Sequence, residues 1–166
     1  MEQVRRRSGE TTRRAVLSAR ILKTTPLRGP IVPRLQIRLL GTFDVALDGE
    51  PVRDFESDSA RALVAYLAAE PGRAFSRATL AELFWPERPE GAAVSNLRHV
   101  LTVLRRVLGT RVGEARFLIS DRTTVSIESS PEVSVDLVEL EHLATTPVDR
   151  QGAVQAWERA AGLWRG

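Results

Sequence analysis

The sequence predicts an α+β fold in which an N-terminal antiparallel sheet, three helices and a C-terminal β-hairpin are followed by a short all-α segment. Three observations lead to this prediction. Apolar and polar residues alternate over residues 35–47, apolar residues recur at helical spacing over 58–108, and alternation returns over 117–128. Three helices alone would leave the apolar face of the third poorly covered, and a sheet at each end closes such a core.

The first alternating segment predicts two strands. Their apolar positions are Leu35, Ile37 and Leu39 in one strand and Phe43, Val45 and Leu47 in the other. Asp48-Gly49 is a strong turn signal. A further short extended piece is expected from Pro51 to about Phe55.

Two short helices are expected next. Asp58 or Ser59 can cap the first, whose apolar stripe is Ala60, Leu63, Val64 and Leu67. Pro71-Gly72 ends this helix. Ser76 caps the second, which ends at Pro86 and directs inward Leu80, Leu83 and Phe84.

A third helix is predicted over residues 92–108, after a polar loop from Glu87 to Gly91, and Gly109 stands where a C-cap glycine belongs. One side of this helix is apolar, with Val94, Leu97, Val100, Leu101, Leu104 and Leu108. The other side is polar, with Ser95, His99, Thr102 and Arg106, and with Arg98 and Arg105 on one shoulder. A helix of this kind, after a shorter helix and a turn, is how many proteins enter the major groove of DNA.

The segments 117–120 and 124–128 read as a hairpin with Arg122 at its tip, between Asp121 and Thr123. From Ser134 a different unit is expected. Asp136 can cap a helix that runs to Leu143, and a second helix is expected over 149–163. This last helix carries a stripe at helical spacing that consists of Ala153, Trp157, Ala160 and Trp164.

The net charge of +3 is unevenly distributed. Residues 1–34 carry nine Arg or Lys against two Glu, and residues 91–127 carry six Arg against two acids, whereas 35–60 and 128–166 are acidic. A phosphate backbone responds to such a local field. The alternative interpretation of the basic residues in 91–127 is a charged helix face that is simply exposed to solvent. The basic composition of residues 1–34 predicts a flexible tail. This tail could be a DNA-binding arm, an artefact of an upstream start codon, or a segment that resembles a transit peptide.

Composition argues against an enzyme and against a cofactor. The chain has no cysteine, and its only two histidines, His99 and His142, lie in different units. It has no phosphate-binding glycine loop and no zinc-protease helix motif. Asp54, Glu56 and Asp58 have the spacing of a calcium loop, but Ser59 stands where that loop needs Gly, so a solvated acidic connector is expected instead. No apolar run approaches the roughly 20 residues of a membrane span, and the composition fits a cytoplasmic protein.

The polar side of residues 92–108 supplies candidate DNA contacts. Arg98 and His99 lie where the groove is usually entered, and Arg98 is the candidate for a bidentate contact to guanine. Ser95, Asn96 and Thr102 could bond bases or phosphates, although Asn96 lies on the opposite shoulder and could equally bond the scaffold. Arg105 and Arg106 are expected to hold phosphates, with pairing to acids of the sheet as the alternative. Arg122, beside Thr123, suits the minor groove, with an ordinary exposed turn residue as the alternative.

These segments together resemble the OmpR/PhoB-type winged helix-turn-helix and, more closely, the SARP-type antibiotic regulatory proteins of actinobacteria. The phrases that carry the resemblance are RLLGTFDVALDGEPV (38–52), ARALVAYLAAEPGRAFSRATLAELFWP (60–86), NLRHVLTVLRRVLG (96–109) and FLISDRTTVSIE (117–128). In that family a helical bacterial transcriptional activation domain follows. Residues 135–143 and 160–166 look like its opening. The implied domains are a basic tail at 1–34, a winged helix at 35–130 and an incomplete activation domain at 131–166.

The resemblance implies a regulator, expected to be an activator, that binds double-stranded DNA and meets RNA polymerase. Residues 92–108 would be the recognition helix, the 117–128 hairpin the wing, and Pro86 to Gly91 the segment that faces polymerase. A monomer is expected in solution, or weak association through the tryptophan stripe, and a dimer on tandem operator repeats. The alternative function is a winged-helix protein-interaction module without DNA binding.

The sequence departs from the family pattern in three respects. The OmpR-type pattern has an arginine where this chain has Val103, which removes one expected cationic contact. No receiver domain is expected within residues 1–34, so phosphorelay control in cis is not expected. Only the first helices of the activation domain are expected.

Overall fold

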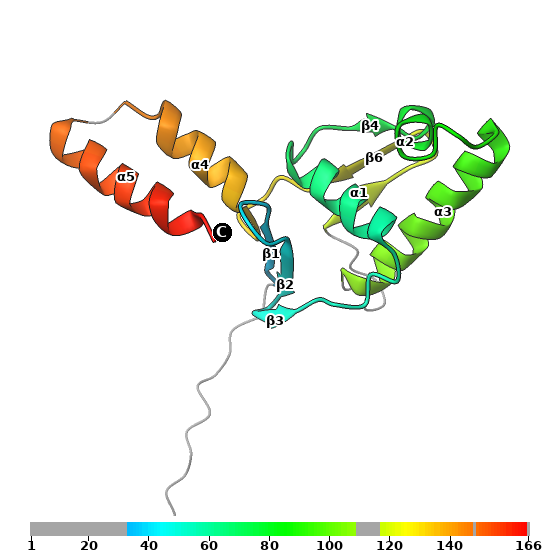
Figure 1. Ribbon diagram of the computed structural model, residues 1–166, viewed down its shortest axis with the longest axis horizontal. Helices are drawn as coiled ribbons and strands as arrows, with labels where there is room; N and C mark the ends of the chain where they lie inside the picture. The colour runs from blue at the N-terminus through cyan, green and yellow to red at the C-terminus, as the bar shows by residue number, and fades with distance from the viewer. Residues whose placement is uncertain (1–32, 109–116, 148, 166) are drawn as a thin grey trace, which may run out of the picture. The chain divides into compact units, whose positions relative to one another are not determined.

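A computed structural model describes residues 33–108, 117–147 and 149–165 (Figure 1). It is a mixed α+β structure with two small sheets, which confirms the predicted fold class. The elements follow in the order β1 (Leu35–Arg38), β2 (Asp44–Leu47), β3 (Glu50–Pro51), α1 (Asp58–Ala68), β4 (Phe75–Ser76), α2 (Arg77–Phe84), α3 (Glu90–Val107), β5 (Leu118–Ser120), β6 (Thr124–Ile127), β7 (Val133–Val135), α4 (Asp136–Thr145) and α5 (Arg150–Leu163). The basic tail, except for its last two residues, and Gly109 lie outside the described residues.

The first sheet has the strand order β3-β2-β1-β7. β1 and β2 are antiparallel, with Leu35 opposite Leu47 and Ile37 opposite Val45. The predicted turn at Asp48-Gly49 is confirmed, and both residues have positive φ (54° and 85°), as a tight two-residue hairpin requires.

β7 was not expected from the sequence, and it pairs parallel to β1 at the other edge from β3. The unit expected from Ser134 therefore begins inside a strand of the first sheet. Asp136 does not cap α4, whose N-cap is Val135. Its buried carboxylate instead accepts hydrogen bonds from the backbone N–H groups of Leu39 (2.7 Å) and Leu40 (3.1 Å). This contact ties the start of α4 to the end of β1.

Helices α1 and α2 form where the apolar spacing predicts them. The expected stripe of α1 is fully buried, but its cap is Ser57 rather than Asp58 or Ser59, and the Ser57 hydroxyl accepts from the N–H of Ala60. Ser76 caps α2, as predicted. Leu80 is buried and Phe84 is half-buried, whereas Leu83 is 51% exposed, so its predicted inward position is wrong.

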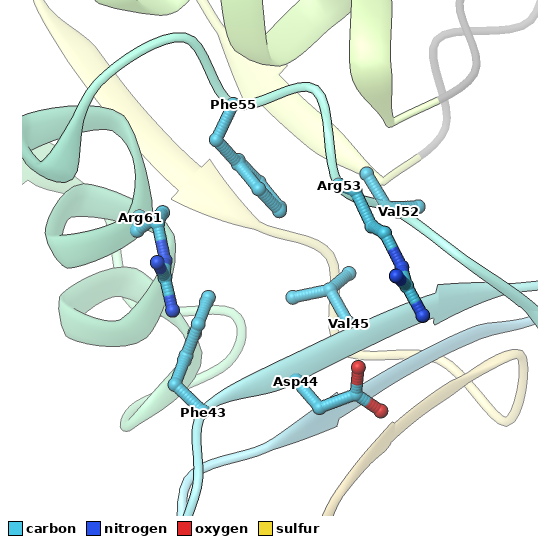
Figure 2. A pocket seen from close by; sticks show the side chains of 7 residues that line it. All are labelled: Phe43, Asp44, Val45, Val52, Arg53, Phe55 and Arg61. Carbon is cyan, nitrogen blue, oxygen red and sulfur yellow. The ribbon is translucent and has the colours of Figure 1, made fainter.

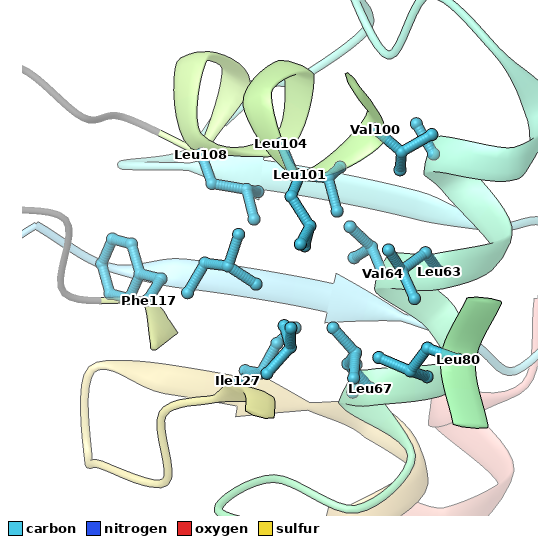
Figure 3. Close-up of a cluster of buried hydrophobic side chains, with 14 of the residues drawn as sticks. Leu63, Val64, Leu67, Leu80, Val100, Leu101, Leu104, Leu108, Phe117 and Ile127 are labelled. Carbon is cyan, nitrogen blue, oxygen red and sulfur yellow. The ribbon is translucent and has the colours of Figure 1, made fainter. Parts of the chain in front are cut away.

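Helix α3 begins at Glu90, two residues before its predicted start, which shortens the loop expected over Pro86 to Gly91. Its apolar side packs on α1 and α2. Figure 3 shows Leu101, Leu104 and Leu108 of this region above a cluster with Phe117, Ile127 and side chains of α1 and α2. Val103, at the departure from the family pattern, is also buried, at 6% exposure. A cation at this position would therefore not face solvent.

The predicted hairpin is confirmed as β5 and β6, with Ser120 opposite Val125. The unexpected strand β4 pairs with β6 and makes a second sheet in the order β4-β6-β5. Val125 and Ile127 of β6 are fully buried. Strands β1 to β3 precede the three helices in the chain, and the hairpin follows them. The helical core is thus closed by a sheet at each end, as the sequence predicts.

Helix α5 begins after Asp149, close to its predicted start, and the Asp149 carboxylate caps it by accepting from the N–H of Gly152 at 2.7 Å. It packs on α4, and Arg159 pairs with Glu139. The two tryptophans of its stripe are largely exposed, Trp157 at 76% and Trp164 at 66%.

Candidate nucleic-acid interface

The polar side of α3 faces solvent. Its exposed side chains are Ser95, Arg98, His99, Thr102 and Arg106. The opposite side of the helix buries six residues. Each fully buried Leu or Val contributes about 1.5–3 kcal/mol relative to exposure. The apolar side therefore fixes how α3 is oriented, and the polar side is left available to a ligand.

The ends of α3 carry charges that suit a helix. Glu90 lies in the first turn, where the helix dipole favours an anion, and Arg105 and Arg106 lie in the last turn, where it favours cations. Thr102 donates its hydroxyl hydrogen to the backbone oxygen of Arg98 at 2.9 Å. Its oxygen remains an acceptor, so a ligand would meet Thr102 as an acceptor rather than as a donor.

Asn96 is half-buried, in keeping with its position on the shoulder of the helix. Among the described residues, its side chain makes no hydrogen bond that would assign it to the scaffold. Both expectations for Asn96, a base contact and a scaffold contact, therefore remain predictions.

The expectation that Arg105 holds phosphates stays a prediction, and among the residues that the structure describes Arg105 pairs with no acid. It is half-buried, and its Nη2 donates to Oγ of Ser120, at the end of β5, at 3.1 Å. Arg77, the first residue of α2, donates to the same oxygen at 2.7 Å. Two guanidinium groups thus converge on one neutral hydroxyl, which leaves a local positive charge where α2, α3 and the hairpin meet.

Arg77 and Ser120 were not predicted from the sequence, because all the predicted contacts lie on the third helix and at the hairpin tip. Arg77 is half-buried, and its Nε is buried without a hydrogen-bond partner among the described residues. No local sequence signal brings a residue of the second helix to a strand 43 positions later. The signal that could have drawn attention to Arg77 is its positive charge at the start of a helix, where the helix dipole disfavours a cation.

Arg106 is held by an acid, as the alternative for this residue anticipated, although the acid is not on a sheet. Its Nη2 forms an ion pair with Glu56 in the connector before α1. The two side chains are 60% and 43% exposed. Glu56 is thus not simply a solvated part of an acidic connector. Because exposed pairs contribute about 0–1 kcal/mol, a ligand anion could displace Glu56 from Arg106.

The hairpin tip is organised by Asp121. Its carboxylate accepts from the N–H groups of Thr123 and Thr124, both at 2.7 Å, and from their hydroxyls at 3.1 and 2.8 Å. These bonds, the Thr124 N–H foremost, hold the pKa of Asp121 well below its usual range. The backbone oxygen of Thr123 also accepts from the N–H of Arg77 at 2.8 Å. The tip is thereby fixed against the start of α2.

Arg122 and Thr123 are both exposed at this tip. Arg122 forms no ion pair within residues 33–108, 117–147 and 149–165, so its charge is available. The Thr123 hydroxyl is already engaged by Asp121. Of the two predicted tip residues, Arg122 is therefore the better placed to meet a phosphate or a groove.

The structure thus brings Arg105 to the hairpin through Ser120, and it presents Arg98, His99, Thr102 and Arg106 on one exposed side of one helix. In the described part of the chain, no three His, Asp or Glu side chains gather where they could hold a metal ion. None of the helices that the structure describes combines the length and apolar character that a membrane span requires.

Among solved structures, the chain is similar to Mycobacterium tuberculosis EmbR in complex with a low affinity phosphopeptide, with a TM-score of 0.64 and 23% sequence identity. The similarity covers 81% of this chain and 37% of the EmbR chain. This chain therefore spans little more than a third of that protein's length, and the likeness establishes a shared fold. No protein-family model matches the chain, and no curated protein matches it.

Proposed function

We propose that this chain binds double-stranded DNA in a sequence-specific manner and regulates transcription. The observation that supports this most directly is the single exposed side of α3, which carries Arg98, His99 and Arg106 and adjoins a hairpin anchored through Ser120. A helix that buries one side and presents cations on the other, beside a β-hairpin, is the arrangement of winged-helix DNA readers. The fold shared with EmbR is consistent with this function.

In this proposal α3 lies in the major groove with its N-terminal half against base edges. Arg98 reads guanine through two hydrogen bonds, and Ser95, Asn96 and His99 contact neighbouring bases or phosphates. Thr102, whose hydroxyl hydrogen is engaged by the backbone oxygen of Arg98, accepts a hydrogen bond from a base. Arg105 and Arg106 hold phosphates, and Arg77 joins them because it shares the Ser120 hydroxyl with Arg105. Arg122, with Thr123 beside it, approaches the adjacent minor groove.

The proposal extends to the SARP-type family and its partners. Residues 35–130 would be the DNA-binding domain, and 131–166 would open an activation domain that meets RNA polymerase in the cytoplasm. We expect a monomer in solution and a dimer on tandem operator repeats. Sedimentation of the free chain tests the first expectation, and a stable tetramer would contradict it.

Fluorescence anisotropy with labelled duplexes tests DNA binding. Three to five phosphate contacts predict that log K falls against log salt with a slope of roughly −3 to −5. A duplex selected from a random pool supplies the cognate site, and an unrelated duplex measures non-specific binding. The alternative function, a winged-helix protein-docking module, predicts no duplex binding even in dilute salt.

Two substitutions separate base reading from phosphate contact. Arg98→Ala should weaken binding to the selected duplex by about 5- to 150-fold and to random DNA much less, since a bidentate pair contributes about 1–3 kcal/mol of discrimination. Arg106→Ala should weaken both alike. Arg159→Ala, which removes an exposed, paired arginine of α5, is the matched control and should change neither. Equal losses from Arg98→Ala and Arg106→Ala would remove the assignment of Arg98.

A further inference from the structure

The hydroxyl of Thr102 has a restricted hydrogen-bonding role. A serine or threonine hydroxyl has one hydrogen to donate and two lone pairs that accept, so it can ordinarily pair with any base. In α3 the hydrogen of the Thr102 hydroxyl goes to the backbone oxygen of Arg98, 2.9 Å away and one turn earlier in the helix. Thr102 is exposed, so it offers a ligand an oxygen that only accepts.

Ser95, on the same exposed side of α3, differs from Thr102 in this respect. Among the residues that the structure describes, no hydrogen bond engages the Ser95 hydroxyl. Ser95 therefore keeps both roles and can meet either a donor or an acceptor on DNA.

The helix backbone around the Thr102 hydroxyl is held in the fold. Leu101 and Val103 are both buried. One turn later, Arg106 pairs with Glu56 in the connector before α1. This connector is anchored by Phe55, whose buried ring is directed toward β2 in Figure 2. The hydroxyl and the carbonyl that accepts its hydrogen are therefore presented on a rigid element, which favours the same arrangement in a complex.

We propose that Thr102 selects a base with an exocyclic amino group, adenine or cytosine, on the DNA strand that it faces. Adenine N6 and cytosine N4 donate hydrogen bonds in the major groove, whereas guanine O6 and thymine O4 only accept them. A keto oxygen opposite Thr102 would meet lone pairs, or it would have to draw the hydroxyl hydrogen away from Arg98. This inference rests on the proposed function, in which α3 lies in the major groove.

The position of the selected base follows from helix geometry. Thr102 lies four residues after Arg98, which is about 6 Å along the helix axis. Because successive base pairs are about 3.4 Å apart, the base that Thr102 selects lies within about two base pairs of the guanine that Arg98 reads.

Selection of duplexes from a random pool, carried out in parallel with the wild-type chain and with Thr102→Val, tests this inference. Valine keeps the branched shape of threonine and removes the acceptor. At one position beside the Arg98 guanine, the wild type should favour adenine or cytosine over guanine and thymine by about 3- to 10-fold. Thr102→Val should lose the preference at that position alone. Thr102→Ser, which retains a hydroxyl that can bond the same carbonyl, should keep it.

A base analogue isolates the amino group. In the selected duplex, unsubstituted purine replaces the preferred adenine, or 2-pyrimidinone replaces the preferred cytosine, so that only the amino group is lost. The wild type should bind this duplex about 3- to 10-fold more weakly in fluorescence anisotropy, beyond any loss shown by Thr102→Val. A change in the duplex itself affects both chains alike. Ser95→Ala is the matched control, and its loss on the analogue should equal that of the wild type.

Guanine or thymine at this position in the wild-type selection would overturn the inference, because Thr102 would then donate. An unchanged preference in Thr102→Val, or equal losses by Thr102→Val and the wild type on the analogue, would overturn it too. Thr102→Val should unfold within about 3 °C of the wild type, which shows that it is folded. If the chain binds no duplex at all, the proposed function fails and the inference fails with it, whereas the other outcomes refute the inference alone.

Discussion

The guanidinium of Arg106, in the last turn of α3, forms an ion pair with the carboxylate of Glu56, a residue 50 positions earlier in the chain. Glu56 has a φ of 59°, a left-handed conformation that is uncommon for a residue other than glycine. It directly precedes Ser57, which caps α1. The connector before α1 thus places a negative charge on one of the cations that we assign to DNA.

This pair predicts that Glu56→Gln increases affinity for duplex DNA. A phosphate and Glu56 compete for Arg106, and removal of the carboxylate leaves only the phosphate. Because an exposed pair contributes about 0–1 kcal/mol, the gain should be up to about fivefold at low salt. Fluorescence anisotropy measures it. Glu70→Gln, which removes an exposed acid paired with Arg73, should have no effect.

A double-mutant cycle checks the cause of this gain. When Arg106 is already Ala, Glu56→Gln should give little or no increase in affinity, because the two residues act through one contact. Weaker binding by Glu56→Gln alone would contradict competition and would mean that Glu56 instead positions Arg106 for the phosphate.

Ser120→Ala should lower both stability and DNA affinity. The substitution removes the acceptor shared by Arg77 and Arg105, and both guanidinium groups are half-buried. A buried donor left without its acceptor costs about 1–3 kcal/mol, and partial exposure places the expected loss near the lower end. Urea unfolding followed by circular dichroism measures it. Ser95→Ala, at an exposed serine of α3, is the control, and an equal loss of stability there would contradict the shared-acceptor explanation.

The lowered pKa of Asp121 predicts an acid-sensitive hairpin. The folded state holds this carboxylate charged through the bonds from Thr124 and Thr123, whereas the unfolded chain has the ordinary pKa of about 3.9. The folded pKa lies below the unfolded one, so the stabilisation is fully present above pH 4 and is lost as the pH falls toward the folded value.

Thermal unfolding at several pH values tests this. Asp121→Asn should unfold at a lower temperature than the wild type at pH 7. This gap between the two unfolding temperatures should close as the pH falls below 4. Asp54→Asn removes an exposed carboxylate that accepts no hydrogen bond within the described residues, and it should show no such gap. A gap of constant size at all pH values would show that charge on Asp121 is not what stabilises the tip.

Leu104→Ala and Leu83→Ala should differ strongly in stability. Leu104 is fully buried on α3, so its truncation should cost about 2–5 kcal/mol. Leu83 is 51% exposed on α2, so its truncation should stay within roughly 0.5 kcal/mol. Denaturant unfolding of both variants measures the difference. A large loss from Leu83→Ala would mean that its side chain is covered, as the helical spacing alone predicts.

The sequence determined the order and kind of most elements because these depend on local spacing. The burial of Leu97, Val100 and Leu104 follows from a repeat of three to four residues, and the turns at Asp48-Gly49 and at Asp121 follow from side chains suited to them. The same spacing predicted that Arg98, His99 and Thr102 would be exposed.

Tertiary structure alone decided what these elements meet. β7 pairs with β1, Asp136 satisfies the N–H groups of Leu39 and Leu40, and Leu83 stays in solvent because neighbouring elements do not cover that side of α2. The partners of Arg105 and Arg106 are likewise distant in the chain. Helical and strand periodicities state which side of an element is apolar, but not which distant segment packs there, and that choice depends on the whole folded chain.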